Sequence, residues 1–111
     1  MLRDDAALLD IARAAQLAMD FARGYDWKTF EDDLRTQSAV LHQISIIGEA
    51  VKRLSESFRL AHPDIPWKEI AGMRDYLVHA YDAVDLEEVW MVVNRDLPTL
   101  LQQIEPFLPK K

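Results

Sequence analysis

Residues 29–61 constrain this chain most, because they hold no proline and only one glycine. Apolar residues recur there every three or four positions, which is the spacing of one face of an α-helix. We expect a long helix that starts at Thr29, with Asp32 as its capping partner three residues on, and that reaches at least Ser55. With 3 glycines and 5 prolines among 111 residues, the chain as a whole favours helices over a turn-rich β fold.

Two apolar stripes run along this long helix. A helix with two such stripes needs two packing partners, and a small chain offers few of them. We therefore expect the second stripe to be buried against another copy of the chain. A glycine in mid-helix costs up to about 1 kcal/mol relative to alanine, so Gly48 predicts close backbone packing at that point. The first stripe holds Leu41, Ile44, Gly48, Val51 and Phe58, and the second holds Val40, Ile47 and Leu54.

An amphipathic helix precedes the long one. Asp4 and Asp5 are candidates for its N-cap, and helix-forming residues continue to Arg23. Gly24 stands where a C-terminal cap belongs. Residues 25–28 then form a short connection to the long helix.

Prolines and an aspartate mark the remaining boundaries. The prolines within residues 63–66 break the helical pattern, and the second of them suits the first position of a helix over residues 67–79. A turn over 81–84 follows, and Asp85 caps a last helix that Pro98 should kink or split. We expect an all-α bundle of four main helices in one domain that spans residues 1–111.

The charge and composition exclude several classes of protein. A net charge of −6 argues against a protein that coats itself in nucleic acid through bulk positive charge, although it allows a small basic site. The absence of cysteine removes disulfides and thiolate metal sites. The early aspartates argue against a signal peptide, and the uncharged run 36–48 is too short and polar to span a bilayer. We expect a cytoplasmic protein without a membrane partner.

Four polar residues gather within eight positions near the end of the predicted helix 67–79. Arg74 is a permanent cation whose planar fork of donors suits a phosphate. His79 can transfer protons near neutral pH. Asp75 precedes His79 by four residues, so that it shares a helix face and can accept a hydrogen bond from the imidazole. Tyr81 completes the cluster.

The spacing of Arg74 and His79 limits how they can cooperate. Five residues on a straight helix place them about 140° apart, so they do not lie side by side. Either the helix unwinds near His79, or Arg74 of one subunit meets His79 of another. A cation, an imidazole and a carboxylate without a metal-ligand set fit metal-independent RNA cleavage, in which a base assists attack by the 2′-hydroxyl and an arginine stabilises the phosphorane charge.

Several other polar and aromatic residues have simpler explanations. His42 and His62 are expected to be structural or solvent-facing. Trp67 and Trp90 are expected to anchor the core or an interface, with base stacking as the alternative. Glu49 could pair with a basic residue across the bundle. The acidic cluster is best explained by helix capping rather than by metal binding, and consists of Asp82, Asp85, Glu87 and Glu88.

The pattern Arg74-x-x-x-x-His79-x-Tyr81 resembles that of the HepT-like family, the HEPN-fold ribonuclease toxins of toxin–antitoxin pairs. The resemblance extends to the segments that surround the pattern and covers nearly the whole chain. These segments are PDIPWKEIAGMRD at 63–75, VDLEEVW at 84–90, IIGEA at 46–50 and DLP at 96–98.

The resemblance implies a homodimer with a composite active site at the dimer cleft, in which Arg74 and His79 are the catalytic pair and no metal or other cofactor takes part. The substrate would be RNA. The partner would be an MntA-like nucleotidyltransferase antitoxin of a type VII system, which transfers AMP from ATP onto Tyr81. The added nucleotide would bring charge and bulk that block RNA. A higher assembly with the antitoxin is also consistent with this resemblance.

Asp75 departs from the family pattern, because many members carry asparagine after the arginine. An aspartate there either orients His79 and stabilises its protonated form, or weakens RNA binding through its charge. The alternative function is a non-catalytic dimeric helical module that binds a nucleotidyltransferase. The acidic net charge favours this module, whereas the intact set of Arg74, His79 and Tyr81 favours the ribonuclease.

Overall fold

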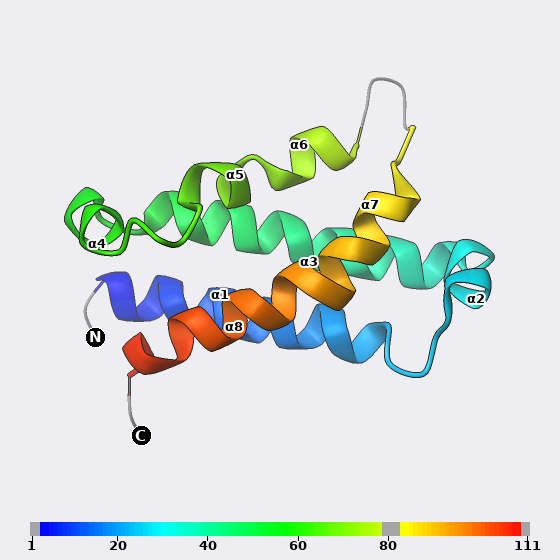
Figure 1. The fold of residues 1–111 in the computed structure, drawn as a ribbon, viewed down its shortest axis with the longest axis horizontal. Coiled ribbons are helices and arrows are strands. Elements are labelled where there is room, and N and C mark those ends of the chain that lie inside the picture. Colours follow the sequence, from blue (N-terminus) through cyan, green and yellow to red (C-terminus); the bar gives the residue numbers. More distant parts are fainter. Residues whose placement is uncertain (1–2, 79–82, 110–111) are drawn as a thin grey trace.

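The fold is an all-α bundle, as predicted. The computed structural model describes residues 3–78 and 83–109, which form helices and one isolated bridge between Val78 and Val84. The chain runs up and down the bundle four times: along α1, back along α3, forward along α5 and α6, and back along α7 and α8 (Figure 1).

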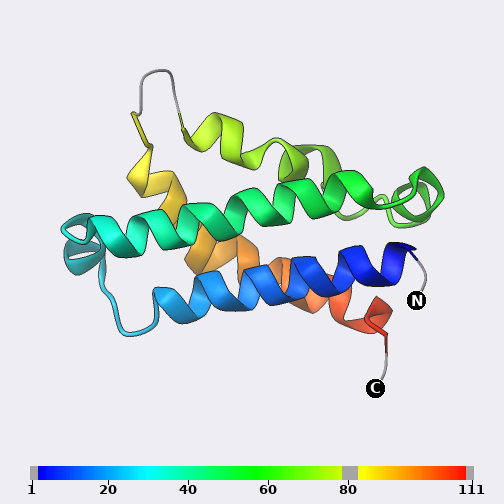
Figure 2. The same ribbon diagram turned by 180° about the vertical axis from the view of Figure 1, so that it is seen from behind.

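The first pass, α1 (Arg3–Phe21), packs antiparallel to α3 (Leu34–Arg53), and the two lie side by side in both views (Figure 2). Because α1 already includes Arg3, the predicted N-cap residues Asp4 and Asp5 stand in its first turn, where their charge favours the helix dipole. The helix ends two residues before the predicted Arg23. Gly24 follows with a φ of +81°, a conformation that glycine adopts readily.

The long helix starts later than predicted, because Asp26 and Asp33 cap two separate helices in this region. Asp26 and Thr29 form a reciprocal capping box that starts the short α2 (Trp27–Glu31). Asp33 then caps α3, accepting a hydrogen bond from the Thr36 backbone N–H at 3.0 Å. The expected start at Thr29 with Asp32 as partner is therefore wrong: Thr29 belongs to the helix before.

The long helix also ends earlier than predicted. α3 stops at Arg53, and Leu54 is extended with a ψ of 142°. Ser55 caps a separate short helix, α4 (Glu56–Ala61), by accepting a hydrogen bond from the Phe58 backbone N–H at 3.2 Å. The Asp4 carboxylate accepts hydrogen bonds from the backbone N–H and the hydroxyl of Ser55, both at 2.7 Å. These side-chain bonds compete with continued helix at this point.

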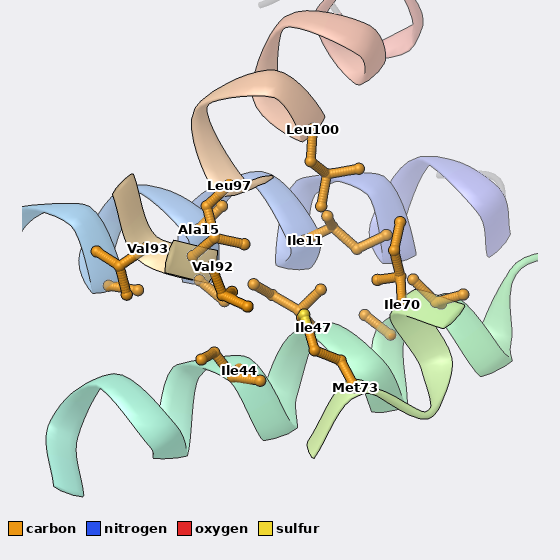
Figure 3. Close-up of a cluster of buried hydrophobic side chains, with 14 of the residues drawn as sticks. Ile11, Ala15, Ile44, Ile47, Ile70, Met73, Val92, Val93, Leu97 and Leu100 are labelled. Atoms are coloured by element: carbon orange, nitrogen blue, oxygen red, sulfur yellow. The ribbon is translucent and has the colours of Figure 1, made fainter. Parts of the chain in front are cut away.

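The second apolar stripe is buried within one chain, so the inference that it needs another copy is wrong. Val40, Ile47 and Leu54 are completely buried without any partner chain. α3 achieves this because α1 packs along it on one side and α5 and α6 pack on another. Figure 3 shows the core that they share with α8: Ile11 and Ala15 of α1, Ile44 and Ile47 of α3, Ile70 of α5, Met73 of α6, Val92 and Val93, and Leu97 and Leu100 of α8.

The last pass is interrupted, as Pro98 predicted. α7 (Leu86–Met91) passes into a π-helical turn over Val92–Asp96 and then into α8 (Leu97–Ile104). Within this turn the Leu97 N–H bonds to the Val92 carbonyl, five residues back. A proline has no N–H to donate and its ring crowds the carbonyl four residues back, so a widened turn accommodates it. A short 3₁₀ turn over Glu105–Phe107 ends the pass.

Candidate active site

Two short helices carry the first half of the polar cluster. α5 (Trp67–Ala71) and α6 (Met73–Leu77) replace the single helix expected over residues 67–79. Gly72 lies between them, with φ and ψ of −96° and 3°, and ends α5 while starting α6. Pro66 serves as the N-cap residue of α5 rather than as its first helical residue, one position from the prediction.

Gly48 brings α5 very close to α3, and this confirms the close packing predicted at that glycine. A Cβ atom placed on Gly48 would lie 3.0 Å from the Ala71 carbonyl oxygen, which is closer than nearly all real Cβ contacts. Two backbones that approach this closely leave the residues that follow Ala71 directly beside the face of α3. Arg74 is one of these residues.

Arg74 projects from α6 at the edge of a polar pocket. Its side chain is 53% exposed, and its Nη1 lies 3.7 Å from the Asp75 Oδ1. A guanidinium with this exposure is accessible to an anionic ligand. The ion pair with Asp75 does not prevent binding, because an exposed pair of this kind contributes little free energy. The pocket has a volume of about 280 Å³ and is lined by Ser45, Gly48, Glu49, Lys52, Ala71, Arg74 and Asp75.

The chain changes conformation directly before His79. α6 ends at Leu77, and Val78 is extended and pairs with Val84 in an isolated antiparallel bridge. The Asp85 N–H also donates to the Leu77 carbonyl at 2.9 Å. The expected helix through His79 is therefore wrong by two residues. His79 and Tyr81, like the rest of residues 79–82, lie outside the described residues.

This ending changes what the helical spacing of Arg74 and His79 implies. The angle of about 140° between Arg74 and His79 assumed one straight helix. Because α6 stops at Leu77 and Val78 is extended, that angle does not apply as far as His79, and both alternatives stay predictions. A second subunit is then no longer required by the spacing and depends on the family resemblance. The orienting role of Asp75 toward His79 stays a prediction.

The acidic cluster caps a helix, as predicted for its described members. Asp85 is the N-cap residue of α7, and its Oδ1 accepts a hydrogen bond from the Glu88 backbone N–H at 3.2 Å. Glu87 and Glu88 occupy the first turn, where negative charge is favourable. Asp82 lies outside the described residues.

The two tryptophans near the site are core anchors. Trp67 is buried, and its indole N–H donates to the His62 carbonyl at 3.0 Å. Trp90 packs against Trp27 and Phe30, with ring centroids 6.3 and 5.1 Å away. These contacts confirm the core prediction for the buried Trp67, and Trp90 is partly buried against the same core.

The remaining side chains with predicted roles lie away from the cluster or pair locally. The His62 ring packs against Phe107, 4.1 Å between centroids, in an aromatic group at the end of the bundle, while His42 is exposed on α3. Glu49 pairs with Lys52 one turn along its own helix, at 3.3 Å, and not across the bundle.

The sequence did not point to two residues: Lys52, which lines the pocket, and Tyr76, which lines a separate groove nearby. Lys52 shares the pocket with Arg74, and its position four residues after Gly48 was the available signal. Tyr76 is half-exposed on α6 and lines a second groove of about 470 Å³ toward α8. Partial burial, followed by the carboxylates of Asp96, Glu88 and Glu69, raises the pKa of Tyr76 above its ordinary value.

Neither metal-ligand clusters nor membrane-spanning helices occur in the described part of the chain. No group of three or more acidic, histidine or cysteine side chains within residues 3–78 and 83–109 is arranged to hold a metal ion. The helices over the same residues are too short or too polar to cross a membrane.

Comparisons with known proteins identify the family. The model of the HepT-like family, described as "Ribonuclease HepT-like", matches residues 11–107. A "Probable ribonuclease HepT" of Thermococcus cleftensis is 44% identical over 98 residues, which is 88% of this chain and 89% of that protein. No solved structure matches the chain significantly.

More distant relatives cover the chain equally well. A "Putative RNase" of Caldanaerobacter subterraneus subsp. tengcongensis is 36% identical over 91% of this chain and 90% of its own length. Another "Putative RNase", of Methanocaldococcus jannaschii, is 33% identical over 90% of this chain and 92% of its own length. The match to the family model and the full-length similarity to these relatives show that this helical bundle belongs to the HepT-like family.

Proposed function

We propose that this chain is a metal-independent endoribonuclease in which Arg74 and His79 are the catalytic pair. One observation carries the proposal: Arg74 presents its guanidinium at the edge of a polar pocket, one turn before the connection that holds His79. The relatives named as ribonucleases supply the substrate class.

The chemistry follows from these two side chains. A base takes the proton of a 2′-hydroxyl while its oxygen bonds to the adjacent phosphorus, and the bond from phosphorus to the 5′-oxygen breaks as that oxygen takes up a proton. His79 is suited to move a proton in this step, because an imidazole can both accept and donate near neutral pH. The Arg74 guanidinium stabilises the charge that builds on the phosphorane oxygens. The products are a 2′,3′-cyclic phosphate and a 5′-hydroxyl.

We further propose the setting that the family resemblance implies. The chain forms a homodimer in the cytoplasm, and Arg74 of one subunit works with His79 of the other. It is the toxin of a type VII toxin–antitoxin pair. An MntA-like nucleotidyltransferase neutralises it by transferring AMP to Tyr81, and the added phosphate and adenosine obstruct RNA.

The direct test is RNA cleavage by the purified chain in the presence of EDTA. The wild-type chain should cleave, and Arg74→Ala and His79→Ala should each lose at least about a hundredfold in rate, because each removes a group that acts in the transition state. Lys28→Ala, an exposed lysine on α2, is the control for altered charge. Activity that persists in His79→Ala, or that EDTA abolishes, would refute the mechanism.

The regulatory proposal has its own measurement. After co-expression with the neighbouring nucleotidyltransferase, mass spectrometry should find one AMP on the peptide that contains Tyr81. Tyr81→Phe should remain unmodified and, when expressed, slow growth even beside the antitoxin. AMP on Tyr76, the half-exposed tyrosine of α6, would contradict the assignment.

The net charge of −6 favours a second candidate, a non-catalytic dimeric module that binds a nucleotidyltransferase, because RNA must approach against long-range repulsion. Growth separates the two candidates. A wild-type chain that is as harmless on expression as Arg74→Ala, yet co-purifies with the nucleotidyltransferase, would support the module over the enzyme.

A further inference from the structure

We propose that the pocket between α3 and α5–α6 is a phosphate subsite, in which Lys52 binds a phosphate of the RNA next to the one that Arg74 holds. The inference rests on the proposed ribonuclease function and deepens it, because it assigns a substrate-binding residue on α3.

The fold brings the two cations together. Gly48 lets α5 approach α3 so closely that Lys52, one turn further along α3, and Arg74, just after α5, line one pocket of about 280 Å³. Both side chains reach water, with exposed fractions of 59% for Lys52 and 53% for Arg74. An ammonium and a guanidinium at one concavity are the groups that proteins use to bind phosphates.

Lys52 and Arg74 are the side chains of this pocket that can donate hydrogen bonds to an anionic ligand, because the other polar side chains are occupied or negatively charged. The Ser45 hydroxyl already donates to the Leu41 carbonyl of its own helix at 3.1 Å. Glu49 and Asp75 are carboxylates and repel a phosphate when ionised. An RNA strand that enters the pocket therefore meets Lys52 at one phosphate and Arg74 at the next.

Each cation has a weak acidic partner that a phosphate can replace. Lys52 Nζ lies 3.3 Å from Glu49 Oε2, and Arg74 Nη1 lies 3.7 Å from Asp75 Oδ1. Exposed pairs of this kind contribute little free energy, so exchange of partners costs little. The carboxylates also weaken the binding of a single small anion, so tight binding requires a strand whose neighbouring phosphates reach the two cations together.

Binding to a short single-stranded RNA tests the subsite, with every variant made in the full-length His79→Ala chain, which we expect not to cleave its ligand. Lys52→Gln should weaken binding about three- to tenfold at low salt and reduce the slope of log affinity against log salt by about 0.7, the value for one lost contact to a single strand. Lys28→Gln is the matched control. Lys28 is also an exposed lysine, and it pairs with Asp32, the C-cap residue of its own helix, at 3.8 Å. It lies on α2, next to the start of α3, whereas the pocket lies along the second half of α3 (Figure 1).

The carboxylates give the opposite arm of the test. Glu49→Gln removes the partner of Lys52 and should tighten RNA binding severalfold, whereas Asp32→Asn makes the same change of charge at Lys28 and should have little effect. In the active chain, Lys52→Gln should raise the KM for RNA more than it lowers kcat, because the contact forms with the substrate and persists in the transition state.

The outcomes separate this inference from the proposed function. If the wild-type chain cleaves RNA but Lys52→Gln binds and titrates with salt as Lys28→Gln does, the subsite is refuted and the ribonuclease stands. If the wild-type chain cleaves nothing while binding still depends on Lys52, the ribonuclease is refuted and the subsite stands. Failure of the His79→Ala chain to bind RNA at all would overturn the subsite.

Discussion

At the scale of single residues, aspartates fix where the helices begin. Asp4, Asp26 and Asp33 each have a pKa below the ordinary value of 3.8. The largest cause is the Ser55 hydroxyl for Asp4, the Thr29 backbone N–H for Asp26 and the Tyr25 hydroxyl for Asp33. Hydrogen bonds to the ionised form favour that form, so these carboxylates contribute to the stability of the folded chain only while they are ionised.

Stability should therefore fall in acid, and Asp4 allows a clean test. A pKa lowered by folding contributes stability above the unfolded value, and this is lost as the pH falls through the folded value. Asp4→Ala should lower the midpoint of chemical denaturation at pH 7 more than Asp5→Ala, which removes a first-turn carboxylate from the same helix. The difference between the two variants should shrink as the pH falls below the ordinary pKa of 3.8 and through the lowered value in the folded chain. An equal effect of both variants at pH 7 would contradict the role given to the bonds with Ser55.

At the scale of elements, one close approach positions the candidate site. α5 and α6 are short helices packed on α3, and the close contact at Gly48 sets how near the start of α6, and with it Arg74, lies to α3. Tertiary contact of this kind outweighs helix propensity, which alone would favour alanine at a mid-helix position.

A pair of glycine substitutions measures this contact. Gly48→Ala places a Cβ 3.0 Å from the Ala71 carbonyl oxygen and should cost about 1 kcal/mol in free energy of unfolding, despite the better helix propensity of alanine. Gly72→Ala is the control, because its Cβ would meet the Lys68 carbonyl oxygen at an ordinary 3.7 Å. Gly48→Ala should also lose RNA cleavage in proportion to the displacement of Arg74. A Gly48→Ala chain as stable as Gly72→Ala would show that α5 moves away without penalty.

The elements themselves were largely predictable, because an apolar repeat and a proline are local signals. α1, α3 and the split last pass follow from such signals. The helix boundaries were less predictable from the sequence. Thr29 and Ser55 can each either cap a helix or bond to a neighbouring aspartate, and only the folded arrangement decides between these roles. The break at Gly72 was missed because a glycine inside a periodic segment does not by itself end a helix.

At the scale of the whole molecule, one chain buries the second apolar stripe of its central helix. The second stripe was assigned to another subunit because periodicity counts apolar faces but not the elements that cover them. Arg74 was identified from the sequence, whereas the pocket that it shares with Lys52 depends on two segments that meet only in the fold. Burial of the second stripe therefore no longer requires a second subunit. The dimer has to be tested through the activity of the site that it is proposed to form.

Mixing two inactive variants tests the central claim most directly, namely that Arg74 of one subunit and His79 of another form one ribonuclease site. Arg74→Ala and His79→Ala are each expected to be inactive, but a heterodimer of the two holds one intact pair. After joint unfolding and refolding in equal amounts, the mixture should recover about a quarter of the wild-type rate of RNA cleavage, because half of the dimers are mixed and each has one working site of two. A mixture that contains heterodimers, as shown by differently tagged chains, and still cleaves no RNA would contradict the shared site.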